Sequence, residues 1–124
     1  MRLLIDSHAL IWWRADSPAL GRAAHNAISD PLNEVLISVA ALWELTIKQS
    51  SGKLVLPTDL ETIVAEEGFA VLSISFAHLR RLETLPRIHR DPFDRMMIAQ
   101  AIAEGIPIVT GDRVFAAYGV QIVW

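Results

Sequence analysis

The sequence predicts an α/β fold in which a central, mostly parallel sheet of four to five strands carries helices on both faces. Short apolar runs alternate along the chain with longer segments of helical periodicity, which is the order that builds β–α–β units. The apolar runs are nearly continuous, as expected of strands covered on both faces. A length of 124 residues, with 52% hydrophobic and 20% charged residues, suits a single globular domain over residues 1–124.

Five apolar runs are the expected strands, and helical patterns separate them. The strands are expected at residues 3–5, 35–37, 69–72, 106–109 and 120–123. The helices are expected at residues 8–14, 18–29, 39–49, 59–67, 75–83, 92–104 and 113–117. This alternation places the helices in the connections between parallel strands.

Capping residues support several of the helix boundaries. Ser17 before Pro18 and Asp91 before Pro92 each offer an N-cap followed by a proline at the first helical position. Gly105 follows the last residue of the 92–104 segment, as glycine commonly does after a helix. The 18–29 and 92–104 segments are therefore expected to begin at these two Ser-Pro and Asp-Pro pairs.

The composition excludes several classes of protein. No cysteine is present, which excludes a disulfide scaffold, a thiolate metal site and a cysteine nucleophile, and fits a reducing compartment. The apolar stretch 35–43 is far shorter than the roughly 20 residues that cross a bilayer. An acid at position 6 argues against a signal peptide. We therefore expect a cytoplasmic protein with no membrane partner.

The net charge of −3 argues weakly against a general polyanion binder, but the basic residues are unevenly distributed. Five of the eleven Lys and Arg residues fall within residues 80–95: Arg80, Arg81, Arg87, Arg90 and Arg95. One reading is a solvated helix face and loop. The other is a surface that contacts phosphates.

Four carboxylates are expected where ligands collect in open parallel sheets, beyond the carboxyl ends of the strands. Asp6 and Asp112 follow expected strands, Glu44 lies in the helix after the second strand, and Asp94 begins the 92–104 helix. Each has a structural alternative, because aspartates such as Asp6 and Asp112 cap helices. Glu44 could simply pair with Lys48 one turn later.

Four convergent carboxylates would either take up protons or bind a hard cation. Two carboxylates about 4 Å apart repel each other by about 4 kcal/mol at an effective dielectric of 20. Oxygen ligands favour Mg²⁺ or Mn²⁺ over zinc. Such a site suits phosphodiester hydrolysis by a metal-activated water. Thr110 and Ser7 could orient that water, or merely cap helices.

These same segments resemble PIN-domain proteins, and specifically the VapC-like toxin ribonucleases of type II toxin–antitoxin systems. LLIDSHALIWW (3–13) resembles the opening of the family and holds Asp6. Residues 38–54, with WEL at 43–45 and GKL at 52–54, hold Glu44. HRDPFDRMMIAQA (89–101), the most specific segment, holds Asp94, and VTGDRVF (109–115) holds Thr110 and Asp112.

The resemblance covers almost the whole chain and implies a three-layer α/β/α PIN-like fold. It implies an endoribonuclease that depends on Mg²⁺ or Mn²⁺, a cognate antitoxin that blocks the site, and a homodimer. The four acids would be both the catalytic and the metal-binding residues. On this interpretation Arg90, Arg95 and His89 flank Asp94 and contact RNA, and Asp91 is an additional acid that caps the helix.

Other functions fit less well. A haloacid-type phosphatase usually has Asp-x-Asp after its first strand, but His8 stands at the third position here. A receiver-type signalling module would need an early acidic pair and a lysine near the last strands, and the only lysines are Lys48 and Lys53. The non-enzymatic alternative is a catalytically silent PIN scaffold that binds RNA or a protein partner.

The tryptophans allow two readings, base stacking or packing in the core and against a partner. Adjacent residues of one helix do not share a face. We therefore expect one of Trp12 and Trp13 to be buried and the other to lie near the surface.

Overall fold

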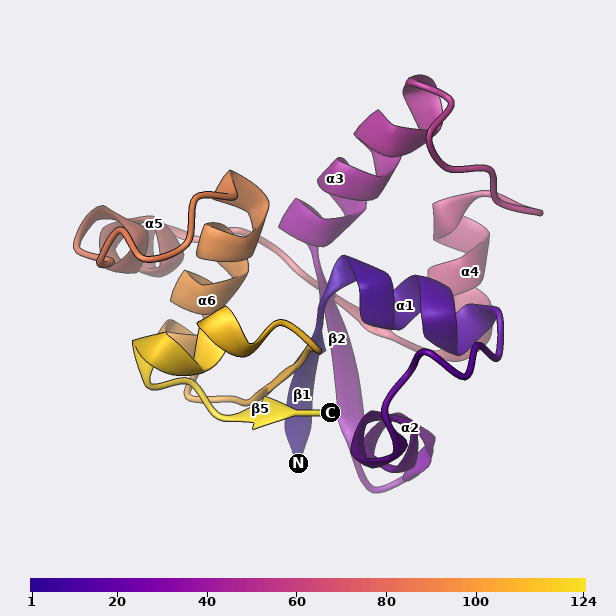
Figure 1. Cartoon of the computed structure of the whole chain (residues 1–124), viewed down its shortest axis with the longest axis horizontal. Helices are drawn as coiled ribbons and strands as arrows, with labels where there is room; N and C mark the ends of the chain where they lie inside the picture. Colours follow the sequence, from indigo (N-terminus) through magenta and orange to yellow (C-terminus); the bar gives the residue numbers. More distant parts are fainter.

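The structure is a computed structural model that describes residues 1–124, and Figure 1 shows the strands between two groups of helices. All five strands are parallel and lie in the order β3-β2-β1-β4-β5. They are β1 (Arg2–Ile5), β2 (Glu34–Ser38), β3 (Ala70–Leu72), β4 (Ile108–Val109) and β5 (Ile122–Val123). In the central register, Leu4 of β1 lies beside Leu36 on one side and Ile108 on the other.

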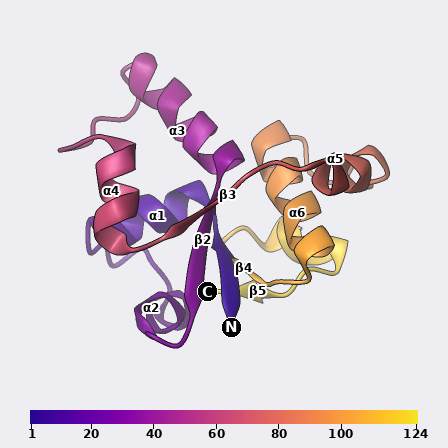
Figure 2. The ribbon, with the colours of Figure 1, turned by 180° about the vertical axis from the view of Figure 1, so that it is seen from behind.

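Helices cover both faces of this sheet, which confirms the predicted α/β/α architecture. The helices are α1 (Ser7–Arg14), α2 (Arg22–Ser29), α3 (Val39–Ser50), α4 (Leu60–Glu67), α5 (Phe76–Glu83), α6 (Pro92–Glu104) and the 3₁₀ helix η1 (Arg113–Tyr118). The chain moves from β1 to β3 in one direction and returns through β4 to β5. Right-handed crossovers therefore place α1, α2 and α4 on one side and α5, α6 and η1 on the other (Figures 1 and 2).

The core lies on both sides of β1 and β2. Leu3, Leu4 and Ile5 have no exposed surface, as expected of a central strand in a parallel sheet. Helix α6 is buried over six consecutive residues, 96–101. It packs against both α5 and α3, so no face of its middle turns remains in water. The start of α6 is thereby held rigidly beside the sheet.

A buried polar chain fixes the start of α3 to α6. The Ser38 hydroxyl caps α3 by accepting from the Ala40 N–H at 3.0 Å, and it donates to Gln100 Oε1 at 2.5 Å. The Gln100 amide donates in turn to the Ser73 carbonyl at 3.4 Å. Ser38 and Gln100 are both fully buried. These bonds satisfy polar groups that would otherwise be costly inside the core.

Two sequence-based expectations are wrong. The 18–29 helix begins at Arg22, because the Ser17 hydroxyl accepts from the Ala19 N–H at 3.1 Å and closes a local turn. Trp12 and Trp13 do not divide into a buried and an exposed residue. Both are half-buried, because long-range contacts cover part of each ring: Trp13 donates to Glu67 Oε2 at 2.8 Å, and Trp12 lies against Trp124.

None of the helices combines the length and the apolar character that a membrane-crossing segment requires.

Candidate active site

Asp6 follows β1 directly and has two structural partners. Its Oδ1 accepts from the Ala9 N–H at 2.7 Å and caps α1. Its carboxylate is also hydrogen-bonded by the hydroxyl of the fully buried Thr110. The same hydroxyl oxygen accepts from the Asp112 N–H at 3.0 Å. Thr110 therefore joins the ends of β1 and β4 through its contacts with Asp6 and Asp112.

Asp94 lies in the first turn of α6, and its carboxylate is free of capping. Asp91 is the N-cap, because its Oδ1 accepts from the Phe93 and Asp94 N–H groups at 2.8 and 3.0 Å. Asp94 directs Oδ2 toward His89 Nε2, 3.2 Å away. The capping role expected for Asp91 is therefore present, and Asp94 keeps its oxygens for other groups.

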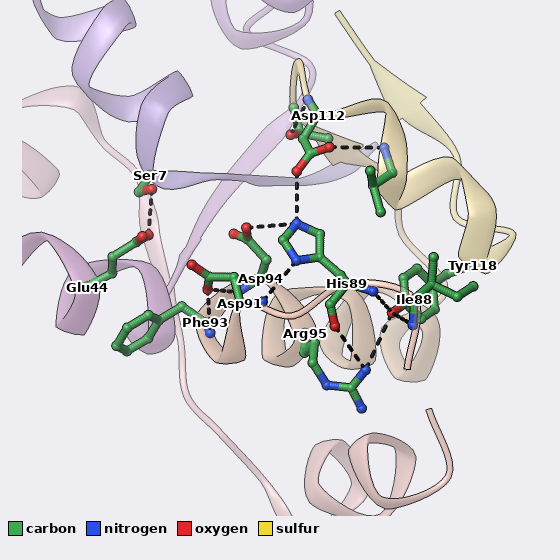
Figure 3. A network of polar contacts seen from close by, with 12 residues as sticks. Ser7, Glu44, Ile88, His89, Asp91, Phe93, Asp94, Arg95, Asp112 and Tyr118 are labelled. Atoms are coloured by element: carbon green, nitrogen blue, oxygen red, sulfur yellow. Dashed lines mark hydrogen bonds and ion pairs between the residues drawn. The ribbon is translucent and has the colours of Figure 1, made fainter. Parts of the chain in front are cut away.

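Asp112 is both a cap and a member of the cluster. Its Oδ1 accepts from the Val114 N–H at 3.0 Å at the beginning of η1. Its Oδ2 lies 2.9 Å from His89 Nε2 (Figure 3). The imidazole of His89 thus bridges Asp94 and Asp112. Potential ligand atoms of these three residues all lie within 4.8 Å of one another.

Glu44 occupies the edge of the same region. Its Oε1 accepts from the Ser7 hydroxyl at 2.8 Å, and its Oε2 lies 3.6 Å from Lys48 Nζ. The pair with Lys48 that the sequence allowed is present, yet only 13% of the Glu44 side chain is exposed. Ser7 is buried and orients this carboxylate. Figure 3 shows Glu44 on the far side of Asp94 from His89.

The carboxylates raise one another's proton affinity. Burial, followed by the charge of Asp91, raises the pKa of Asp94 to about 7, with smaller contributions from Glu44 and Asp6. Burial also raises the pKa of Asp6, to which Glu44 adds. Bringing these groups out of water and together costs free energy that a cation would recover. Electrostatics therefore connect Asp6, Glu44 and Asp94, although Glu44 makes no direct contact with the other two.

A cavity of about 320 Å³ opens onto three of the acids. Asp6, Asp94 and Asp112 contribute to its lining, and Trp12 and Trp124 form part of its apolar wall. A larger hollow of about 590 Å³ lies between the ends of α5, α6 and η1, but no carboxylate lines it. The chemistry of the lining thus points to the smaller cavity.

Sequence patterns gave no indication that Trp124 belongs to this wall. Its place depends on a tertiary contact with Gly21, where a Cβ would lie 2.1 Å from the Trp124 carbonyl oxygen. The Ala24 N–H donates to that oxygen at 3.2 Å. Only the folded chain reveals this contact, because the two segments are far apart in sequence.

The arginines expected to contact RNA have different surroundings. Arg90 is exposed, and its side chain has no protein partner. Arg95 instead donates to the carbonyls of Pro86 and Leu85 at 2.8 and 3.2 Å. Its guanidinium therefore holds the 85–89 loop, and its contact with RNA stays a prediction.

The residues present fit a hard divalent cation. Asp6, Asp94 and Asp112 supply carboxylate oxygens at one cavity, and the pKa values of Asp6 and Asp94 are raised first by burial and then by neighbouring carboxylates. Carboxylate oxygen is the ligand type that Mg²⁺ and Mn²⁺ prefer. These three side chains would hold the ion, with Glu44 at its edge.

A model of the PIN domain family matches residues 3–121. The chain belongs to the PIN-domain family. Within that family it is VapC-like: Ribonuclease VapC22 of Mycobacterium tuberculosis is 30% identical over 114 residues, which cover 90% of this chain and 87% of that protein.

Solved structures share this PIN fold over nearly the whole chain. VapBC2 from Rickettsia felis, crystallised with a DNA fragment from its promoter, matches with a TM-score of 0.71 and 15% identity, covering 98% of this chain and 97% of that one. FitAcB from Neisseria gonorrhoeae matches with a TM-score of 0.66 and 17% identity, covering 97% and 95%. A toxin–antitoxin complex from Klebsiella pneumoniae matches with a TM-score of 0.66 and 20% identity, covering 98% and 96%. At these identities the similarity establishes the fold.

Proposed function

We propose that this PIN-domain protein is a divalent-metal-dependent endoribonuclease and the toxin component of a type II toxin–antitoxin module. The observation that carries the proposal is the cluster of Asp6, Asp94 and Asp112 at one cavity, with Glu44 beside it. The relative named Ribonuclease VapC22 supports RNA as the substrate. Mg²⁺ or Mn²⁺ held here would activate a water molecule and neutralise charge on the phosphoryl oxygens.

The chain's own residues prepare the site for this chemistry. Thr110 and Ser7 hold the carboxylates of Asp6 and Glu44 in place from buried positions. The caps made by Asp6 and Asp112 fix their backbones relative to the strand ends. Placing charged ligands before the substrate arrives avoids reorganisation during the reaction.

Substrate phosphates would enter past Arg90, which is exposed next to the residues that cluster with Asp94. Phosphate contacts position a nucleic acid without reading its sequence. The exposed Arg80, Arg81 and Arg87 extend this basic surface along α5 and the following loop. This surface offsets the net charge of −3, which would otherwise repel RNA.

Protein partners are proposed from a separate surface. Val39, Trp43 and Ile47 form an exposed row along α3, and 58% of Trp43 is accessible. A row of large apolar residues at helical spacing is typical of an interface. The neighbour from Klebsiella pneumoniae is a toxin–antitoxin complex by name. We propose a cognate antitoxin and a homodimer for this protein, acting in the cytoplasm.

Light scattering of the protein alone and with its antitoxin separates these two partners. A dimer that Ile47→Glu dissociates would assign the α3 row to the contact between copies. A monomer in both forms, combined with antitoxin binding lost in Ile47→Glu, would assign the row to the antitoxin. Binding and dimerisation that are both unaffected would remove the row from either interface.

Cleavage of labelled total cellular RNA tests the enzymatic proposal. The wild type with Mg²⁺ or Mn²⁺ should yield discrete fragments that chelator abolishes and that Asp94→Asn does not produce. Asp59→Asn is the matched control, because Asp59 is an exposed N-cap of α4 and asparagine caps equally well. Equal cleavage by wild type and Asp94→Asn would refute the assignment of the acids. Intact RNA with every protein would favour the silent scaffold.

A further inference from the structure

Both ring nitrogens of His89 are engaged. Nδ1 accepts from the backbone N–H of Asp91 at 3.1 Å. Nε2 lies 2.9 Å from Asp112 Oδ2 and 3.2 Å from Asp94 Oδ2 (Figure 3). The ring also packs edge-on against Phe115, with centroids 5.7 Å apart. His89 therefore has one defined orientation beside the acids.

The contact with Asp91 determines which nitrogen carries the hydrogen. A backbone N–H can only donate, so Nδ1 must be the unprotonated nitrogen that accepts. The hydrogen of the neutral imidazole is then on Nε2, facing the two carboxylates. In this tautomer Nε2 has no lone pair to offer a cation. By position alone, His89 resembles a metal ligand beside Asp94 and Asp112. Its hydrogen bond from the Asp91 N–H excludes that role, because it leaves the hydrogen on Nε2.

The loop that carries His89 is fixed independently of the ring. The Tyr118 hydroxyl oxygen accepts from the N–H groups of Ile88 and His89 at 3.0 and 2.6 Å. Arg95 holds the Leu85 and Pro86 carbonyls of the same loop. The loop therefore leaves Nε2 facing the acids, and Nε2 could bind a cation only if its hydrogen moved to Nδ1, which would break the hydrogen bond from the Asp91 N–H.

We propose that His89 is a positioning residue whose Nε2–H holds Asp94 and Asp112 together for the cation, and that it is not itself a ligand. The Nε2–H donates to Asp112 Oδ2 at 2.9 Å, and Asp94 Oδ2 lies 3.2 Å from the same nitrogen, so the partial positive charge of this N–H offsets the repulsion between the two carboxylates. The role in catalysis rests on the proposed nuclease function. The hydrogen-bonding role and the effect on cation binding do not.

Nitrogen-15 NMR of the wild-type histidines tests the tautomer directly. Two-bond ¹⁵N–¹H correlations at pH 8.5 should show the hydrogen on Nε2 of His89, both without metal and with saturating Mg²⁺. The resonance is assigned by its absence from His89→Asn. A hydrogen on Nδ1 in the Mg²⁺-bound protein would identify His89 as a ligand and overturn the proposal.

Two substitutions of His89 distinguish the role of Nε2 from that of Nδ1. His89→Gln can place an amide N–H near the position of Nε2, whereas His89→Asn can satisfy only the Asp91 N–H. Calorimetry with Mn²⁺ should show affinity within about 3-fold of wild type for His89→Gln. Affinity should fall about 10- to 100-fold for His89→Asn, as is typical when a residue that orients metal ligands is lost. Equal affinities for wild type and His89→Asn, or equal losses in both variants, would refute the role.

RNA cleavage is measured alongside binding and should follow the same order. Thermal unfolding of both variants checks that they are folded. If the wild type binds Mn²⁺ with the predicted dependence on His89 but cleaves no RNA, the nuclease proposal fails while the positioning role stands. If Mn²⁺ binding does not depend on His89 while cleavage is intact, the positioning role fails alone.

Discussion

Asp94→Asn should stabilise the metal-free protein, and the gain should grow with pH. Burial and neighbouring acids raise the pKa of Asp94 from an ordinary value of 3.8 to about 7. Between about pH 4 and pH 7 the folded protein keeps a proton on Asp94 that the unfolded chain has released. Stability is therefore lost as the pH rises through this window. Below it the carboxyl is neutral in both states and costs nothing.

The size of this penalty follows from the shift. A difference of about three between the folded and unfolded pKa values corresponds to about 4 kcal/mol of lost stability. This value is an upper bound because 21% of the Asp94 side chain is exposed. We expect Asp94→Asn to gain about 2 kcal/mol at pH 8 and almost nothing at pH 4. For a chain of this size that gain raises the unfolding temperature by roughly 5–10 °C.

Thermal unfolding in chelator at pH 4, 5, 6, 7 and 8 measures the effect. Asp59→Asn is the control, because the pKa of Asp59 is shifted in the opposite direction from that of Asp94: hydrogen bonds from Thr62 lower it. A lowered pKa stabilises the fold above pH 4, so removing that carboxylate should give no gain at any pH. A difference between Asp94→Asn and wild type that stays flat from pH 4 to 8, or a loss at pH 8, would refute this account of the site.

Three further outcomes are expected. Mn²⁺ should bind more tightly at pH 8 than at pH 5.5, because binding must displace the proton from Asp94; calorimetry with an unchanged affinity would contradict this. Gln100→Ala should destabilise the protein by about 2–4 kcal/mol in urea unfolding, since it leaves the buried Ser38 O–H without an acceptor beside a cavity; a loss below 1 kcal/mol would contradict it. Arg90→Gln should reduce the slope of log RNA affinity against log salt by about 0.7 without changing stability. An unchanged slope would indicate that Arg90 is a solvated surface residue that does not contact RNA.

The convergence of the acids could be predicted because it depends on local order and topology. Asp6 and Asp112 come just after strands, and the carboxyl ends of parallel strands meet at one edge of the sheet. Glu44 could also be placed near them from its position on the helix after β2. The geometry brings these side chains to one region, and their roles as ligands stay predictions until metal binding is measured.

The bridge made by His89 could not be predicted in the same way. Its position depends on Tyr118, which holds its loop from 29 residues away, and no local pattern encodes that contact. The start of α2 was misplaced for a related reason. A serine before proline is compatible with either a turn or a helix cap, and at Ser17 the turn forms. The helix begins only after Gly21, where the chain contacts Trp124.

Asp6 and Asp112 each hold the first turn of the helix they begin, whereas Asp94 leaves that task to Asp91. Substitutions at these acids should therefore differ in whether they reduce the amount of folded protein or only its activity. If the protein is the toxin proposed above, a selection for surviving cells separates them: changes at Asp6 or Asp112 carry a folding cost and should lower the amount of protein. Under the proposed function, a change at Asp94 should leave a folded, inactive chain that still competes for the proposed antitoxin.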